Sequence, residues 1–88
     1  MAASLIMNKT ELAQALVTGG HAERVEDAEA VLDALASIIW HALEHAHDVE
    51  WPRVGTFGVA PADRRRRAVT FQPATELEVA VNRHHLEI

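Results

Sequence analysis

Apolar residues recur at helical spacing near the start of the chain. Asn8 can cap a helix, and Glu11, three residues later, can complete a capping box by reaching back to the backbone of the cap. A pair of glycines at residues 19–20 ends the segment, because glycine readily adopts the left-handed conformation that closes many helices. The pattern predicts a first helix over about residues 8–19, with residues 1–7 as a frayed leader.

A second, longer helix is predicted over about residues 24–46. Its apolar positions form one stripe and then extend well beyond it, while acidic residues occupy the remaining face. A chain of 88 residues has little else that could cover so broad an apolar surface. We therefore expect two copies of this helix to bury each other in a dimer. The expected interface residues on this helix are Leu32, Leu35, Ile38, Ile39, Trp40 and Leu43.

The residues that follow Asp48 are β-prone rather than helical. A strand at residues 54–59 and a return strand at residues 68–71 predict a hairpin, with its turn at residues 60–66. With a short strand before this hairpin, the segment of about residues 48–71 is expected to supply three strands.

The last element is expected to be a short helix over about residues 73–82. Pro73 can start it, since the first helical turn tolerates a missing backbone amide. Residues 83–88 have no clear pattern and are interpreted as a tail. The order is helix, helix, three strands and helix within one domain of residues 8–82, which places the chain in the α+β class.

Charge is distributed unevenly along the chain. The net charge of −5 argues against nucleic-acid binding. Residues 1–50 contain two basic and nine acidic residues, a net charge of −7, whereas residues 51–88 contain six basic and four acidic residues, a net charge of +2. Such asymmetry can mark an anion-binding face. There is no cysteine, and no signal-peptide or membrane-spanning pattern, so we expect a cytoplasmic protein without disulfides or a membrane partner.

Four motifs, in the expected order, resemble the HU and integration host factor family of bacterial histone-like proteins. They are MNKTEL at residues 7–12, Asp27-Ala28-Glu29 with Leu32-Asp33-Ala34, Val-Gly-Thr-Phe at residues 54–57, and Phe71 followed by Leu77, Val81 and Asn82. The resemblance covers about residues 7–82. It implies an HU-like intertwined homodimer with Phe57 and Phe71 in its core, and a non-enzymatic DNA-binding role in the nucleoid.

The chain departs from this family in the length and the tip of the β-arm, which in relatives reaches around DNA. Thirteen residues separate Phe57 from Phe71, about half of the family's usual interval. A hairpin of this length reaches about 15–20 Å, which is too short to wrap a duplex. The arm also lacks the arginine–asparagine–proline tip whose proline wedges between bases. We therefore expect little DNA bending.

The densest positive charge lies in this shortened arm. Arginine forks match phosphate oxygens, and release of condensed counterions drives binding to DNA. Without a recognition helix, binding to double-stranded DNA is expected to be largely sequence-nonspecific. A solvated turn, or pairing of the arginines with acids of the same dimer, is the simpler interpretation. The expected phosphate contacts are Arg53, Arg64, Arg65, Arg66 and Arg67, with Lys9 and Arg83 as weaker candidates.

A protein-interaction role is the main alternative. A short-armed, acidic chain with an intact dimerisation face could pair with a full-armed HU-like relative and modulate its DNA binding. A metal site based on His41 and His45 is a weaker hypothesis, because these residues do not form a His-Glu-x-x-His pattern. No arrangement typical of catalysis is present, so we expect neither an enzyme nor a cofactor, metal or small-molecule substrate.

Overall fold

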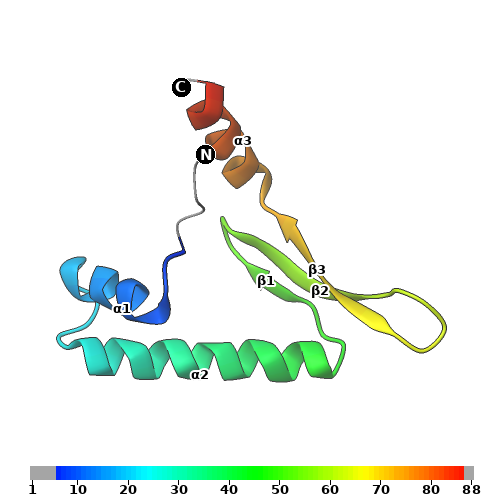
Figure 1. The fold of residues 1–88 in the computed structure, drawn as a ribbon, viewed down its shortest axis with the longest axis horizontal. Helices are drawn as coiled ribbons and strands as arrows, with labels where there is room; N and C mark the ends of the chain where they lie inside the picture. Colours follow the sequence, from blue (N-terminus) through cyan, green and yellow to red (C-terminus); the bar gives the residue numbers. More distant parts are fainter. Residues whose placement is uncertain (1–5, 87–88) are drawn as a thin grey trace. The chain divides into compact units, whose positions relative to one another are not determined.

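A computed structural model describes residues 6–86, so most of the expected leader and the last residues of the expected tail lie outside it (Figure 1). The elements follow in the order α1, α2, β1, β2, β3 and α3. They form two compact units, one up to Ile38 and the other from Ile39 onward, and α2 runs from the first unit into the second.

Helix α1 (Lys9–Thr18) begins and ends as its sequence predicts. The side chain of Asn8 accepts a hydrogen bond from the amide of Glu11 at 2.9 Å, and the Glu11 carboxylate accepts one from the amide of Asn8 at 3.4 Å. The predicted capping box is therefore confirmed. At the other end, Gly20 adopts a φ of 81°, and the amide of His21 donates to the carbonyl oxygen of Leu16 at 2.8 Å. This closure needs a left-handed residue, which glycine supplies without steric cost.

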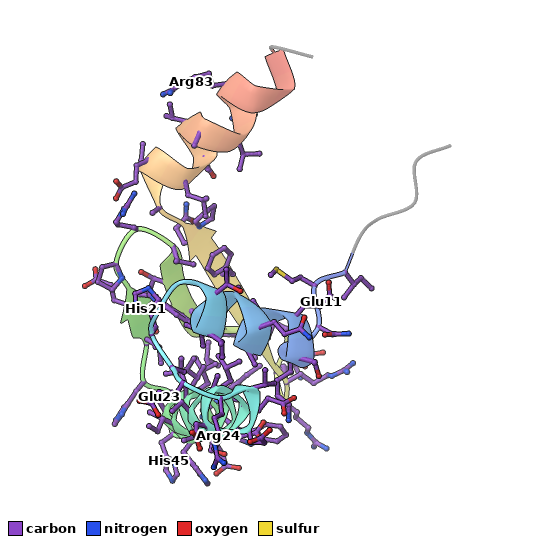
Figure 2. The ribbon with its side chains drawn as sticks, turned by 90° about the vertical axis from the view of Figure 1, so that its left-hand side faces the viewer. Glu11, His21, Glu23, Arg24, His45 and Arg83 are labelled. Atoms are coloured by element: carbon purple, nitrogen blue, oxygen red, sulfur yellow. The ribbon has the colours of Figure 1, made fainter. Side chains whose placement is uncertain are left out.

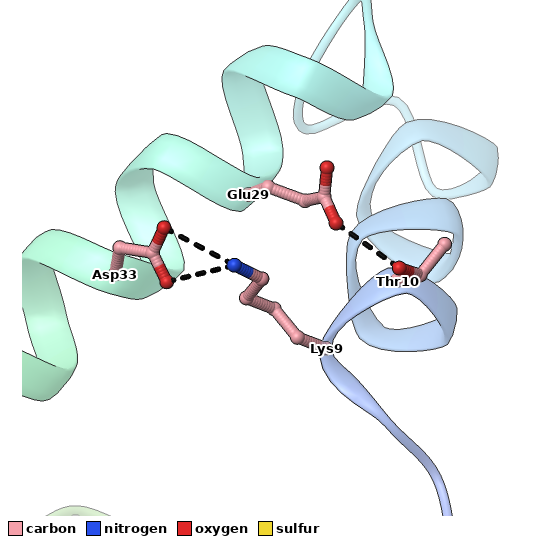
Figure 3. Close-up of polar contacts among 4 residues, drawn as sticks. All are labelled: Lys9, Thr10, Glu29 and Asp33. Carbon is pink, nitrogen blue, oxygen red and sulfur yellow. Dashed lines mark hydrogen bonds and ion pairs between the residues drawn. The ribbon is translucent and has the colours of Figure 1, made fainter.

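The first turns of α2 (Val25–Glu44) are tied to α1 by polar bonds. Lys9 Nζ lies 3.1 and 3.2 Å from the two carboxylate oxygens of Asp33, and the Thr10 hydroxyl donates to Glu29 at 3.1 Å (Figure 3). Ala13 of α1 and Ala28 of α2 are the buried hydrophobic residues of the described chain. The small side chains at these two positions bury little apolar area.

The end of α2 comes two residues earlier than expected, after Glu44. Ala46 adopts a φ of 61°, and the amide of His47 donates to the carbonyl oxygen of Ala42 at 2.8 Å. A left-handed residue stops helical propagation, even though alanine is otherwise the best helix former. Alanine carries a side chain into a conformation that glycine adopts more easily, so this closure holds local strain.

Strands β1 (Val49–Trp51), β2 (Gly55–Pro61) and β3 (Arg67–Pro73) form an antiparallel sheet in the order β1-β2-β3. The predicted three-stranded sheet is confirmed, and its hairpin is longer than expected. The strands pair as far as Pro61 and Arg67, so the turn expected at residues 60–66 is a shorter loop at residues 62–66.

The expectation that Pro73 starts the final helix is wrong. Pro73 pairs with Gly55 at the end of β3, and α3 begins at Thr75 and extends to Leu86. Proline is tolerated here because β3 is an edge strand, in which a missing amide costs no ladder bond on the open side. Residues 83–86, expected to belong to a tail, are part of α3.

The register divides the sheet into an apolar face and a polar face. Phe57 is opposite Phe71 with ring centroids 4.9 Å apart, and Val59 is opposite Val69 on the same face. Gly55 allows this packing, because a Cβ at that position would lie 2.7 Å from the Phe71 ring. Among the described residues this face remains partly open to water, with Phe71 46% and Val69 67% exposed.

No large side chain is fully buried in the described part of the chain. Among the expected interface and core residues, Ile38 is 66%, Trp40 is 71% and Phe71 is 46% exposed. The remaining ones are half-buried: Leu32, Leu35, Ile39, Leu43 and Phe57. A single chain therefore leaves much of its apolar surface in water, which opposes folding as an isolated monomer.

Candidate nucleic-acid interface

The tip of the β2–β3 hairpin is an ordered loop. The amides of Ala62 and Asp63 both donate to the carbonyl oxygen of Arg66, at 3.1 and 3.4 Å. The Asp63 carboxylate accepts a hydrogen bond from the amide of Arg65 at 3.0 Å, which makes an Asx turn inside the run of arginines. Backbone and side-chain bonds thus define the path of the loop between the two strands, and the loop closes the long hairpin in Figure 1.

The expected phosphate-contacting run, Arg64–Arg67, surrounds a hollow at this tip. The hollow has a volume of about 480 Å³ and is lined by all four arginines together with Asp63, the end of β2 and Ala46. The four side chains belong to exposed residues. Within residues 6–86, no carboxylate forms an ion pair with any of these guanidinium groups. Four exposed cations around one concavity can hold an anion with several acceptor oxygens, such as a phosphate group.

Arg53 occupies a second position, at the base of the hairpin. The amide of Val54 donates to the carbonyl oxygen of Trp51 at 3.0 Å, which closes a β-turn with Pro52 and Arg53 in its centre. Arg53 has a φ of 71°, which is the conformation that a type II turn requires after proline and that glycine normally supplies. An arginine in this left-handed conformation is held in a strained backbone.

The Arg53 side chain is 85% exposed, and its Nε lies 4.0 Å from a carboxylate oxygen of Glu76 in the first turn of α3. This distance and exposure make the pair weak, because water screens exposed ion pairs. The turn itself is anchored, since the carbonyl oxygen of Val54 accepts a hydrogen bond from the amide of Ala74 at 2.9 Å. Arg53 is therefore presented from a fixed turn beside α3.

The weaker candidates differ from each other. Lys9 is occupied by both oxygens of Asp33, so its ammonium group must leave that carboxylate before it can bind a phosphate (Figure 3). Arg83 is exposed on α3, as its label in Figure 2 shows. Arg24, which the sequence did not single out, lies 3.4 Å from Asp27 and 3.6 Å from Glu26.

The histidines near the end of α2 each lie close to an oxygen atom of a neighbouring residue. The Nδ1 atom of His45 lies 2.8 Å from the carbonyl oxygen of His41, and His41 Nδ1 lies 3.8 Å from Glu44. Among the residues that the structure describes, no group of three potential ligands could hold a metal ion. None of the helices described has the length and apolarity that crossing a bilayer requires.

Two features of this interface escape sequence reasoning. Pro61 and Asp63 mark the turn in the sequence, but they do not show that the Asp63 carboxylate accepts a hydrogen bond from the amide of Arg65. The strained φ of Arg53 follows Pro52, which is favoured at the same position of both type I and type II turns. Proline therefore signals the turn without identifying its type.

Comparisons with known proteins agree on one family and one fold. Residues 7–84 match the family model described as bacterial DNA-binding protein. Two HU structures from Thermotoga maritima, a mutant and an unmodified protein, are 28% and 27% identical to this chain with TM-scores of 0.73 and 0.70. Each match covers 85% of this chain, with 99% of the mutant and 98% of the other protein.

A cocrystal structure of Anabaena HU with DNA has 21% identity and a TM-score of 0.72, over 85% of this chain and 97% of that one, which supports the fold alone. The comparison with curated proteins finds no match.

Proposed function

The chain belongs to the bacterial DNA-binding protein family and has an HU-like fold, and we propose that it binds double-stranded DNA as a homodimer without strong sequence preference. The observation that carries this proposal is the hollow at the arm tip, where Arg64–Arg67 are exposed and free of carboxylate partners in the described chain. Phosphate groups are the anions that a DNA-binding family offers to such a cluster. A role in the bacterial nucleoid follows from the same family membership.

The homodimer is supported by the apolar surface that one chain leaves in water. Ile38 and Trp40 on α2 and Phe71 on β3 are all substantially exposed, and only two alanines are buried among the hydrophobic residues described. At about 25 cal/mol per Å² of apolar area, covering such side chains with a second copy contributes more than most surface interactions. A dimer also doubles the arginine tips and lets them act on one duplex.

The acidic remainder of the chain makes modest affinity the expected result. The net charge is −5, and residues 1–50 alone carry −7, so long-range repulsion by DNA opposes the attraction at the arms. β2 and β3 each have seven residues, which limits the arm to about 20 Å. An arm this short cannot pass around a duplex, and we therefore infer little DNA bending.

Salt dependence of DNA binding tests the proposal directly. On duplex DNA the slope of log affinity against log salt is about 0.9 per phosphate contacted. A dimer has eight arginines in the two tips, and if about half of them engage, the tips contribute about −3 to −5 to the slope. Replacing Arg64–Arg67 together with serine should flatten the slope and weaken binding to all sequences alike, because phosphate contacts carry no base information.

The controls separate loss of contact from loss of fold. The run lies in an exposed loop, so the quadruple variant should keep the circular dichroism spectrum and the dimer mass of the parent. A folded variant that binds DNA as tightly as the parent would show that the tip is only a solvated turn. A parent protein without salt-sensitive binding at low ionic strength would refute DNA binding itself.

A further inference from the structure

We propose that Asp63 is the residue that positions the arginine tip, and that its backbone bond is needed for tight phosphate binding although its charge opposes it. The inference rests on the proposed function, since it concerns the same loop. Asp63 lines the hollow together with Arg64–Arg67, so an acidic residue borders the site that an anion would occupy. A solvated turn does not require an acidic residue at this position. The geometry of the loop, however, gives Asp63 a structural role.

That role is the hydrogen bond from the amide of Arg65 to the Asp63 carboxylate, 3.0 Å long. The backbone amide of Asp63 supplies a second constraint, because it donates to the carbonyl oxygen of Arg66 at 3.4 Å. Asp63 thus links the backbone on both sides of Arg64, and these bonds limit the directions in which the neighbouring guanidinium groups leave the loop. Binding by an ordered cluster avoids the entropy loss that a flexible cluster incurs when a ligand fixes it.

The carboxylate also has an electrostatic effect of the opposite sign. A phosphate held by the tip arginines would lie near this negative charge, and like charges at short distance repel. Because the residue is exposed, salt screens this repulsion. Asparagine separates the two effects, since its side-chain oxygen can accept the same bond from Arg65 without carrying a charge. Alanine removes both the bond and the charge.

The experiment therefore compares Asp63→Asn with Asp63→Ala in the full-length dimer. The first measurement needs no DNA: limited digestion with trypsin, with cleavage at the tip identified by mass. Both variants lack the carboxylate, so any effect of that charge on the protease is common to them. We expect the tip of D63A to be cut about five to ten times faster than that of D63N, since losing one hydrogen bond opens the loop more often.

The second measurement is affinity for a 20-base-pair duplex as a function of salt. At low salt D63N should bind about two to five times more tightly than the parent, and this gain should shrink as salt rises. D63A should bind about threefold more weakly than D63N at every salt concentration, because the two proteins differ in loop order and not in charge. Equal trypsin rates for the two variants would overturn the positioning role, and equal DNA affinities would overturn its relevance to binding.

The failure of the two proposals can be told apart. If the parent binds no DNA at any salt concentration, the proposed function fails, and a faster cut in D63A then still supports an Asp63-ordered loop. If the parent binds DNA with a salt slope near the expected value while the two variants behave alike, the proposed function stands and the inference about Asp63 is refuted.

Discussion

Replacing Arg53 with asparagine should make the protein more stable and its DNA binding weaker. Arg53 has a φ of 71° in the turn after Pro52, and a left-handed conformation costs an ordinary L-residue about 1–2 kcal/mol. Asparagine tolerates this conformation much better, and unlike glycine it does not add much freedom to the unfolded chain. The two copies in a dimer double whatever is gained in one chain.

The stability gain can be estimated from this strain. About half of the cost should be recovered, which gives about 0.5–1 kcal/mol per chain. The substitution also removes the pair with Glu76, but at 4.0 Å and with side chains 85% and 66% exposed that pair contributes little. Urea unfolding at one fixed protein concentration should therefore show a higher midpoint for Arg53→Asn than for the parent.

The loss of binding follows from the phosphate contacts. If each Arg53 contacts one phosphate, the dimer loses two contacts, and the slope of log affinity against log salt becomes less negative by about 1.8. Arg53→Lys is the matched control, because lysine keeps both the positive charge and the strained backbone. This control should retain the stability and nearly the whole salt slope of the parent.

Two outcomes would refute this reasoning at different points. A lower urea midpoint for R53N than for the parent would mean that the positive φ of Arg53 stores no strain, or that the exposed pair with Glu76 matters more than its geometry suggests. A higher midpoint with an unchanged salt slope would show that Arg53 is strained but does not contact phosphate.

Three further predictions concern assembly, bending and helix closure. Unfolding of the parent should depend on protein concentration, because folding and dimerisation are expected to be coupled. Ile39→Asp should give an unfolded or aggregated chain, because it buries an unpaired charge in the expected dimer interface. A stable monomer of the parent, measured by light scattering at micromolar concentration, would contradict both expectations. Energy transfer between the ends of a bound duplex should show little bending. A sharp bend would refute the inference that an arm of this length cannot deform the duplex. Ala46→Gly should raise the free energy of unfolding by about 1 kcal/mol, because Ala46 has a φ of 61°, and an unchanged urea midpoint would count against strain at this position.

The sequence alone was sufficient for the features that depend on neighbouring residues. The capping box of Asn8 and Glu11 involves atoms three residues apart, so its pattern is visible in the sequence and was confirmed. The order of helices and strands follows from hydrophobic spacing, which is also local. The arginine run was visible for the same reason, since four consecutive charged residues can be read from the order of residues without knowing the fold.

Tertiary structure determined the conformation at positions where local rules allow two outcomes. Pro73 is compatible with a helix start and with an edge strand, and its pairing with Gly55 selected the strand. Pro52 permits both common turn types, and the left-handed Arg53 occurs in a turn that is hydrogen-bonded, through Val54, to Ala74, the residue before α3. The arrangement of Asp63 and the arginines around one hollow likewise needs the loop to close across two paired strands. The contacts of Pro73 with Gly55 and of Ala74 with Val54 join residues that are far apart in the sequence, which is why no local pattern predicts them.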